Sequence, residues 1–167
     1  MGICAVQLAR RAGARVIGTV RTSSDESTAK NAGAHEVLFS DKELPSRIRA
    51  LAPGGIDHIV EVAFGANIEA DVELLKQGGS IASYATDNAT PKIPFWRMVV
   101  KNLRLFFLGS DDFPKEAKSQ AARDLNAVLE AGWSGFEIGE RIPLTDIARA
   151  HELAEHPVRR GRAVIVI

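Results

Sequence analysis

The sequence predicts an α/β fold in which helices cover both faces of a parallel sheet. Segments typical of strands and segments typical of helices alternate along most of the 167 residues. The strand-like segments, such as RVIGTV at residues 15–20 and LRLFFL at residues 103–108, are short and mainly apolar. Strands without a regular apolar–polar alternation are typical of sheets that are buried on both faces. One domain is the simplest organisation, because no linker, internal repeat or low-complexity segment interrupts the pattern.

The chain begins with a predicted helix, turn and strand at residues 2–22, GICAVQLARRAGARVIGTVRT. Residues 3–12 are mostly apolar or alanine before Arg10, which predicts a helix buried along most of its length. Gly13 suits the left-handed position just after a helix. The apolar run at residues 15–20 is long enough for a buried strand and too short for a helix.

The alternation continues to residue 85. The helix after residue 22 begins with polar residues that commonly cap helices. After residue 41, leucine and isoleucine recur on one helical face. Glycine or proline follows each helix and ends it. The expected helices cover residues 23–32, 41–51 and 67–76, and the expected strands cover residues 36–39, 56–63 and 80–85.

The last part of the chain follows the same pattern after a loop at residues 87–94. Pro114 fits the first turn of a long helix, whose apolar stripe runs from Ala117 through Leu125 to Val128. The remaining expected helices cover residues 95–102 and 145–155, and the remaining strands cover residues 103–108, 136–142 and 163–167.

The composition argues against several classes of function. Lys plus Arg and Asp plus Glu each number 21, so no net charge favours nucleic acid or a membrane surface as partner. Cys4 is the only cysteine, which excludes a disulfide framework and a cysteine-rich zinc site. The four histidines lack the spacing of metal ligands, so we expect no metal. The sequence has neither a signal peptide nor an apolar run of about 20 residues, and we expect a cytoplasmic protein.

The ends of the expected strands are the places to look for a ligand site, because doubly wound sheets bind ligands at their carboxyl ends. Small, polar or glycine-bearing segments follow four of these strands. They lie at residues 21–24, 63–67, 84–86 and 109–110. Their composition suits a nucleotide groove, although many parallel-sheet proteins share it.

Four longer segments carry a resemblance to a known family. They are GICAVQLARRAGARVIGTV, KNAGAHEVL, GIDHIVEVAFGANIEADVELLKQGGSIASYA and PLTDIARAHELAEHPVRRGRAVIVI. Together, and in this order, they resemble the cofactor-binding half of the medium-chain dehydrogenases/reductases, in particular the zinc-independent NADPH:quinone reductases of the zeta-crystallin type. The resemblance implies a Rossmann-like fold and NADPH as cofactor. It also implies that the intact enzyme transfers a hydride from the nicotinamide to a quinone or an activated alkene.

The resemblance further implies that parts of the family's fold are absent from this chain. A full-length member starts with a barrel-like domain, then a central first strand and a glycine-rich loop, of which only Gly2 has a counterpart here. We therefore expect a doubly wound parallel sheet that lacks its first strand, in a fragment that is inactive alone. The strands at residues 15–20 and 56–63 would flank the gap. They would pair with each other, accept a strand from another chain, or leave the fragment poorly folded.

The end of the strand at residues 15–20 suggests which coenzyme is preferred. NAD-preferring proteins of this fold usually have an acid there, which binds the ribose 2′-hydroxyl. Val20 and Arg21 occupy the position in this sequence. Arg21 could pair with a 2′-phosphate through two hydrogen bonds, and Thr22 and Ser23 could donate to it, which favours NADPH over NADH. The alternative is that Arg21 is a solvated surface residue.

By resemblance, a further group of residues lies beside the nicotinamide ring, and Gly2 with the helix that follows forms a partial phosphate site. Asn67 could instead cap the helix that follows it. No side chain stands out as a catalytic acid or base, which suits quinone reduction because the hydride chemistry belongs to the nicotinamide. The residues expected beside the ring are Ala63, Phe64, Asn67, Tyr84, Ala85, Thr86, Gly109 and Ser110.

The sequence is also compatible with other functions, and it suggests a second copy of the chain as a partner. Enoyl reductases of the same superfamily are the nearest alternative, and a non-enzymatic remnant could bind nucleotide weakly or associate through its sheet edges. A methyl-donor-dependent transferase shares the alternation, but such proteins usually have an acid where Val20 stands. The strand that starts at Leu103 and ends at Leu108 is expected near a sheet edge. Related enzymes pair such edges, so we expect a homodimer through it, although a covered edge is also compatible with the sequence.

Overall fold

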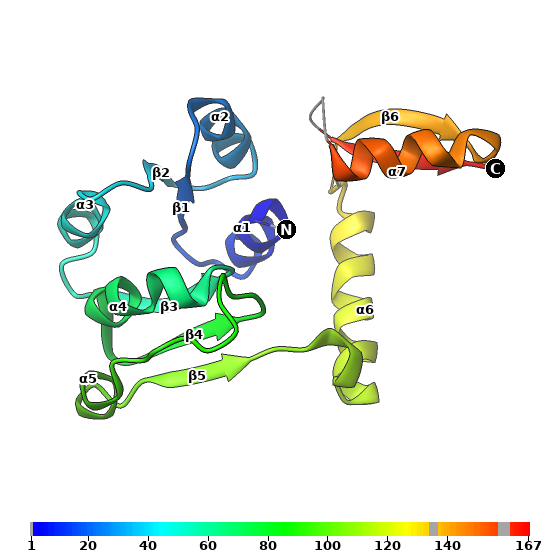
Figure 1. The fold of residues 1–167 in the computed structure, drawn as a ribbon. Coiled ribbons are helices and arrows are strands. Elements are labelled where there is room, and N and C mark those ends of the chain that lie inside the picture. Colours follow the sequence, from blue (N-terminus) through cyan, green and yellow to red (C-terminus); the bar gives the residue numbers. More distant parts are fainter. Residues whose placement is uncertain (1, 134–136, 157–160) are drawn as a thin grey trace. The chain divides into compact units, whose positions relative to one another are not determined.

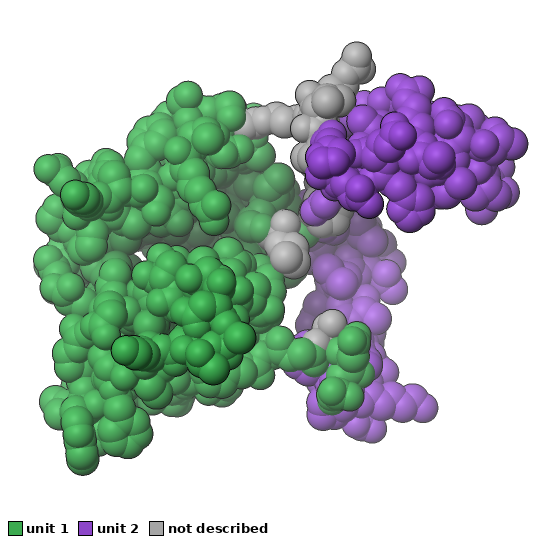
Figure 2. Space-filling view, viewed as in Figure 1, with its two compact units in different colours: residues 1–112 green, residues 113–167 purple. Residues whose placement is uncertain are grey.

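The computed structural model describes residues 2–133, 137–156 and 161–167, in which helices and strands alternate (Figure 1). These residues form two compact units, Met1–Asp112 and Phe113–Ile167 (Figure 2), and each unit is described by itself. Every strand pair in the described residues is parallel. The α/β class with parallel sheets, which the sequence predicts, is therefore confirmed.

The first unit contains most of the helices and strands expected from the sequence, with boundaries that differ by a few residues. In chain order they are α1 (Gly2–Arg11), β1 (Ile17–Val20), α2 (Ser23–Asn31), β2 (Glu36–Phe39), α3 (Leu44–Leu51), β3 (Ile56–Glu61), α4 (Phe64–Leu74), β4 (Leu75–Ser83), α5 (Phe95–Val100), β5 (Arg104–Phe107) and the 3-10 turn η1 (Ser110–Asp112).

The strands of this unit form two separate sheets. β1 pairs with β2, with Ile17 opposite Glu36 and Val20 opposite Phe39. β3, β4 and β5 form the second sheet, with β4 in the middle. Within the described residues β1 and β3 do not pair with each other, so one edge of each strand finds no strand partner. The direct pairing of these two strands, one of the three outcomes expected from the sequence, is therefore absent from the described residues.

The core of the first unit lies between α4 and the three-stranded sheet. Phe64, Ile68 and Val72 recur at every fourth position along α4, and each is only 1% exposed. They pack in one cluster with Leu75 and Ile81 of β4. Burial of each such side chain stabilises the fold by about 1.5–3 kcal/mol. The cluster therefore fixes α4, and the turn at its start, against the sheet.

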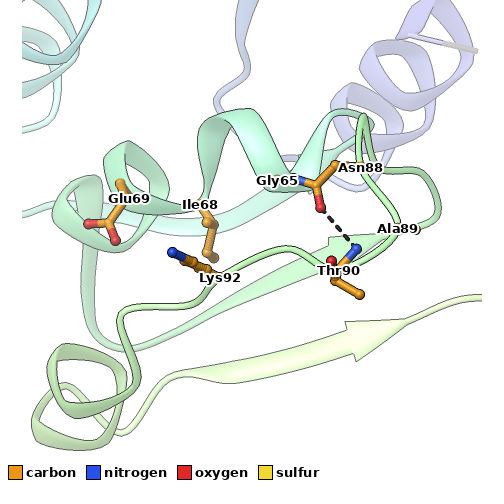
Figure 3. Close-up of a pocket in the computed structure, with 7 residues that line it drawn as sticks. All are labelled: Gly65, Ile68, Glu69, Asn88, Ala89, Thr90 and Lys92. Carbon is orange, nitrogen blue, oxygen red and sulfur yellow. Dashed lines mark hydrogen bonds between the residues drawn. The ribbon is translucent and has the colours of Figure 1, made fainter.

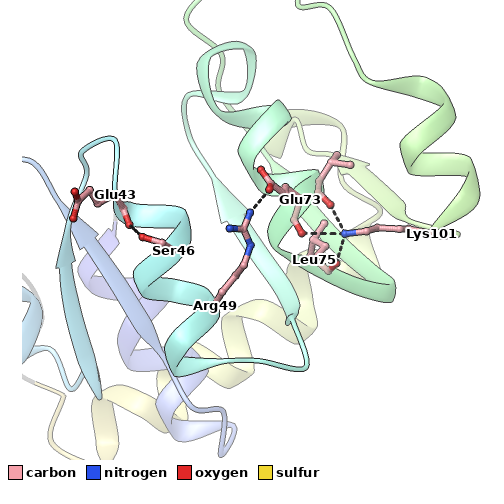
Figure 4. A network of polar contacts seen from close by, with 7 residues as sticks. Glu43, Ser46, Arg49, Glu73, Leu75 and Lys101 are labelled. Atoms are coloured by element: carbon pink, nitrogen blue, oxygen red, sulfur yellow. Dashed lines mark hydrogen bonds and ion pairs between the residues drawn. The ribbon is translucent and has the colours of Figure 1, made fainter.

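The carboxyl end of α4 is held by Lys101, which follows α5 (Figure 4). The Lys101 ammonium group donates hydrogen bonds to the carbonyl oxygens of Val72 at 2.7 Å, Glu73 at 3.0 Å and Leu75 at 2.8 Å. The last carbonyl groups of a helix lack partners within the helix, and a cation there also complements the helix dipole. Arg49 of α3 forms an ion pair with Glu73 on the same turn.

The start of β4 differs from the expectation of a helix to residue 76 and a turn at Gly78. β4 begins at Leu75, directly after α4. Leu75 lies opposite Ile56 whereas Ser80 lies opposite His58, so the chain bulges between these two pairs instead of turning. Gly55 permits this close approach, because a Cβ atom there would lie 2.8 Å from the backbone nitrogen of Lys76.

The prediction that the first helix is buried is wrong. No described residue of α1 is buried, and Cys4 is only half-buried. The strand that follows α1 belongs to a sheet of two strands. A sheet of this width offers too little surface to cover a helix along its length, so the apolar side of α1 remains partly open.

The second unit contains α6 (Lys115–Glu130), β6 (Ile138–Pro143), the 3-10 turn η2 (Leu144–Asp146), α7 (Ile147–Glu155) and β7 (Arg162–Val166). β6 and β7 pair in parallel, and α7 connects them and packs on both. Pro114 is the N-cap of α6 and not a first-turn residue, and only Val128 of the expected apolar stripe is buried. The expected strand start at Phe136 lies outside the described residues. No helix in the described part of the chain is long and apolar enough to cross a membrane.

Candidate functional site

The turn after β3 and the segment after β4 are joined by hydrogen bonds. The backbone N–H groups in the first turn of α4 are the donors, and the segment after β4 supplies a carbonyl, a hydroxyl and a carboxylate oxygen as acceptors. A Cβ atom at Gly65 would lie 2.6 Å from Asp87 Oδ1, so glycine permits this contact. The donor–acceptor pairs are Phe64 N to Ala85 O at 3.3 Å, Gly65 N to Thr86 Oγ1 at 3.2 Å and Ala66 N to Asp87 Oδ1 at 2.8 Å.

A cavity of about 430 Å³ opens beside this junction, at the carboxyl ends of β4 and β5. The rings of Phe64 and Phe107 meet edge to face in its wall, with centroids 5.3 Å apart. Five of the residues expected beside the nicotinamide line the cavity, so the structure brings them together. The lining residues are Phe64, Ser83, Tyr84, Ala85, Thr86, Pro91, Phe107, Leu108 and Gly109.

A second cavity, of about 600 Å³, lies against α4 and the loop after Thr86 (Figure 3). Ile68 and Glu69 of the helix line it opposite Lys92 of the loop. The loop is braced here by a hydrogen bond from the Thr90 N–H group to Asn88 Oδ1 at 2.9 Å. Five of the eight residues expected beside the nicotinamide line the first cavity, and none of the eight is among the described residues that line this one.

Glu61, the last residue of β3, fixes the turn that leads into α4. Its Oε1 atom accepts the backbone N–H groups of Val62 at 2.7 Å and Ala63 at 2.5 Å. Both carboxylate oxygens also lie 3.1 Å from the side-chain nitrogen of Asn67. Glu61 is only 6% exposed, so these donors replace the water that a charged group would otherwise bind.

Asp71 lies on α4, one turn after Asn67, and is 7% exposed. Burial, the nearby charge of Glu61 and a hydrogen bond to Glu61 raise the pKa of Asp71 to about 8. With a pKa in this range, Asp71 keeps its proton at neutral pH and can donate a hydrogen bond to the Glu61 carboxylate. Its Oδ2 atom is buried without a hydrogen-bond partner among the described residues.

The alternative that Asn67 caps a helix is wrong. The N-cap of α4 is Ala63, and Asn67 lies within the first turns of the helix. Its side-chain amide donates to Glu61 instead. The helix starts earlier than expected because the segment after β4 satisfies its first N–H groups, and no local side chain is needed for this.

The residues expected at the 2′-phosphate form a separate group after β1. Val20 is buried, whereas Arg21 is exposed and has neither a hydrogen bond nor an ion pair within the described residues. Thr22 is the N-cap of α2, and its hydroxyl donates to Asp25 Oδ2 at 2.5 Å. Ser23 is the first residue of that helix. The preference for NADPH was inferred from the lack of an acid at the end of the strand at residues 15–20. That inference did not take Asp25 into account, whose carboxylate accepts a hydrogen bond from Thr22.

The two remaining site residues belong to different ends of the first unit. Gly2 starts α1 and is exposed, and a Cβ atom there would meet no other atom within 4 Å. Ser110 starts η1, and its side chain lies outside the described part of the structure.

Sequence reasoning missed the two acidic side chains that shape the site. Glu61 stands out as the one acid near the carboxyl end of the IDHIVEVA segment, which could have identified it. Asp87 carries no comparable signal, because its contact with α4 depends on how two distant segments meet. The sequence predicts Phe107 and Leu108 as strand residues and gives no sign that they line the cavity.

The parallel strands, the covering helices and the cavity at the strand ends define a Rossmann-like α/β protein. The model of the zinc-binding dehydrogenase family matches residues 1–123. The chain therefore belongs to this family, and the resemblance to the medium-chain dehydrogenases/reductases is confirmed.

Several quinone oxidoreductases are similar in sequence. The one from Pongo abelii is 32% identical over 162 residues, which cover 93% of this chain and 48% of the relative. The one from Homo sapiens is 31% identical over 162 residues, with the same coverage of 93% and 48%. The chain thus spans about half the length of the curated relatives it matches.

Solved structures share the fold. A mycobacterial protein complexed with NADPH is 25% identical, with a TM-score of 0.80 over 99% of this chain and 53% of the other. A mycobacterial quinone oxidoreductase is 24% identical, with a TM-score of 0.88 over 99% of this chain and 53% of the other. At that identity, the second likeness shows the fold alone.

The family's description refers to zinc, and the residues described here do not fit a zinc site. No three histidine, cysteine, aspartate or glutamate side chains among them are grouped so that they could hold a metal ion. The buried carboxylate of Glu61 is occupied by the backbone N–H groups of Val62 and Ala63, and the buried carboxyl group of Asp71 has a pKa raised to about 8. We derive no step of the function through a metal.

Proposed function

We propose that this chain is the NADPH-binding part of an oxidoreductase that transfers a hydride to a quinone or an activated alkene. The observation that carries the proposal is the cavity between Phe64, Tyr84 and Phe107, at the carboxyl ends of adjacent parallel strands. The names of the similar quinone oxidoreductases and the NADPH complex of a structural neighbour support it. The activity is proposed for the whole protein, because this chain spans about half of its relatives.

The residues after β1 support NADPH over NADH. Arg21 offers an exposed guanidinium that no described acid engages, beside the start of α2. A 2′-phosphate could accept two hydrogen bonds from it and one from Ser23. Asp25 opposes this preference by its charge, and its Oδ2 atom accepts a hydrogen bond from the Thr22 hydroxyl.

The chain's own residues would orient the bound cofactor and keep water away from it. When bound, the nicotinamide supplies the hydride. The rings of Phe64 and Phe107 meet edge to face in the cavity wall, and Ala85 and Gly109, which have small side chains or none, also line the cavity. A quinone accepts the hydride with little help from an acid, so these largely apolar walls suit it. An enoyl reductase would use the same walls, and a substrate test on the whole protein distinguishes the two.

A non-enzymatic role is the second candidate, and one observation favours it. β1 and β3 lie in separate sheets, and each leaves one edge without a strand partner in the described residues. Unpaired strand edges are sites where another strand can add. On this alternative the chain associates through these edges and binds nucleotide weakly.

The Arg21→Ala variant tests the proposed cofactor preference. Loss of the guanidinium should weaken NADPH binding by about tenfold or more, equivalent to about 1.4 kcal/mol, and leave NADH binding within about twofold. Titration calorimetry with both nucleotides measures this, and Arg123→Ala on α6 is a matched control. Equal effects on NADPH and NADH would show that Arg21 does not bind the 2′-phosphate.

A further inference from the structure

We propose that Glu61 is a positioning residue for the turn between β3 and α4, and that a proton on Asp71 holds Glu61 in place. The turn would therefore respond to pH in the slightly alkaline range. The consequence for cofactor binding rests on the proposed function, since Phe64 follows this turn and lines the cavity.

The geometry of the turn carries the proposal. The Glu61 carboxylate accepts two successive backbone N–H groups, those of Val62 and Ala63, and the Asn67 side chain. These contacts fix the chain direction between the last residue of β3 and the first turn of α4. Phe64 follows at once, 1% exposed, with its N–H group on the carbonyl of Ala85. A shift of Glu61 would therefore move the aromatic wall of the cavity.

Asp71 is the group that keeps Glu61 in this position. It lies one turn after Asn67 on α4 and is buried like Glu61, and while it carries a proton its carboxyl group can donate to the Glu61 carboxylate. Two ionised carboxylates side by side in a buried site repel each other strongly. Loss of the proton should push Glu61 away from Asp71 and weaken its hold on the turn.

Among the described residues of the neighbouring elements, no other charged group takes part in this pair. β4 presents the uncharged Ser83 opposite Glu61. The basic residues of the neighbouring helices in the described structure have other partners. Arg49 of α3 pairs with Glu73, Arg97 of α5 pairs with Glu69, and Lys101 donates to backbone carbonyls. His58, the basic residue of β3, is hydrogen-bonded to Ser80. Glu61 is the one charged group that acts on the pKa of Asp71.

The test begins with the nucleotide-free wild-type chain in solution. Amide resonances of Val62 and Ala63, and the carboxyl carbon resonance of Asp71, are followed by NMR from pH 6.5 to 9. The proposal expects all three to shift together with one midpoint near pH 8. No response of the two amides in this range, or a response at a pH different from that of Asp71, would overturn it.

Variants separate a positioning role from a general loss of stability. Asp71→Asn keeps a hydrogen-bond donor to Glu61 but cannot ionise, so the amide response between pH 7 and 9 should disappear. Glu61→Gln removes the charge beside Asp71, and the Asp71 midpoint should move to lower pH. Glu73→Gln, a matched change on an exposed acid of the same helix, should leave the wild-type response in place. An unchanged amide response in Asp71→Asn would refute the proposal.

Cofactor titration then decides the functional consequence separately. The NADPH dissociation constant should rise about threefold or more between pH 7 and pH 9, and the rise should be lost in Asp71→Asn. Responsive amides with an NADPH affinity that is constant over this range would overturn the link between the turn and binding. Responsive amides without NADPH binding at any pH would leave Glu61 as a positioning residue and refute the proposed function.

Discussion

Glu61 and Asp71 lie beside each other where β3 leads into α4, and both are more than nine-tenths buried. Neither belongs to the residues that the family resemblance places beside the nicotinamide. The Glu61 carboxylate nevertheless connects the end of the strand, the turn and the helix through Val62, Ala63 and Asn67. Burial beside this charge raises the pKa of Asp71 to about 8.

The raised pKa of Asp71 makes the stability of the fold depend on pH. The folded chain keeps the proton up to a pKa of about 8, whereas the unfolded chain releases it near the ordinary value of 3.8. The contribution of Asp71 is therefore fully present below pH ~4, falls by about 1.4 kcal/mol per pH unit up to pH ~8, and is constant above that.

Denaturant titrations of the wild-type chain and Asp71→Asn at pH 5, 6, 7, 8 and 9 measure this contribution. The stability of the wild type relative to the variant should decrease with rising pH and level off above pH ~8. The difference between the two proteins isolates Asp71 from other titrating groups. A difference that stays the same at every pH would mean that Asp71 is not held in its protonated form.

At the scale of elements, α4 organises the first unit. The segment after β4 satisfies its first N–H groups, Lys101 satisfies its last carbonyl groups, and its apolar face covers the sheet. Exposed ion pairs such as Arg49 with Glu73 contribute little beside these contacts. The position of the cavity thus follows from how one helix is held at both ends.

β5 is the edge strand of the three-stranded sheet in the described residues, and we propose that it pairs with β5 of a second chain. Phe106 and Phe107 on this strand are 47% and 67% exposed. Phe106→Lys should convert a dimer to a monomer, because a charge on both chains would oppose pairing. Light scattering measures the mass, and Leu129→Lys, an equally exposed site on α6, is the control. A wild-type monomer, or a variant that remains dimeric, would refute the proposal.

The sequence predicts the order and type of these elements well, because apolar runs and glycine positions are local signals. It does not predict where α4 starts, since the acceptors for its first N–H groups come from residues after β4. The bulge that replaces the expected turn near Gly78 also depends on a partner strand. For the same reason Glu61 and Asp25 were not included in the candidate site, as their roles arise only from contacts made in the fold.

At the scale of the whole molecule, the first unit combines two sheets that do not pair with each other in the described part of the chain. The residues around Arg21 follow a strand of one sheet, and those around Phe64 follow strands of the other. A dinucleotide that binds this chain would have to use both groups. Cofactor binding therefore tests the whole arrangement at once. Because the chain belongs to the zinc-binding dehydrogenase family, we expect it to bind the cofactor.

The most direct measurement is titration calorimetry of the purified chain with NADPH and, in parallel, with NADH. The account predicts a single site that binds NADPH at least about tenfold more tightly than NADH, a difference of about 1.4 kcal/mol. Absence of binding for both nucleotides, or equal affinity for the two, would contradict the account. The first of these results would favour association through the open edges of β1 and β3.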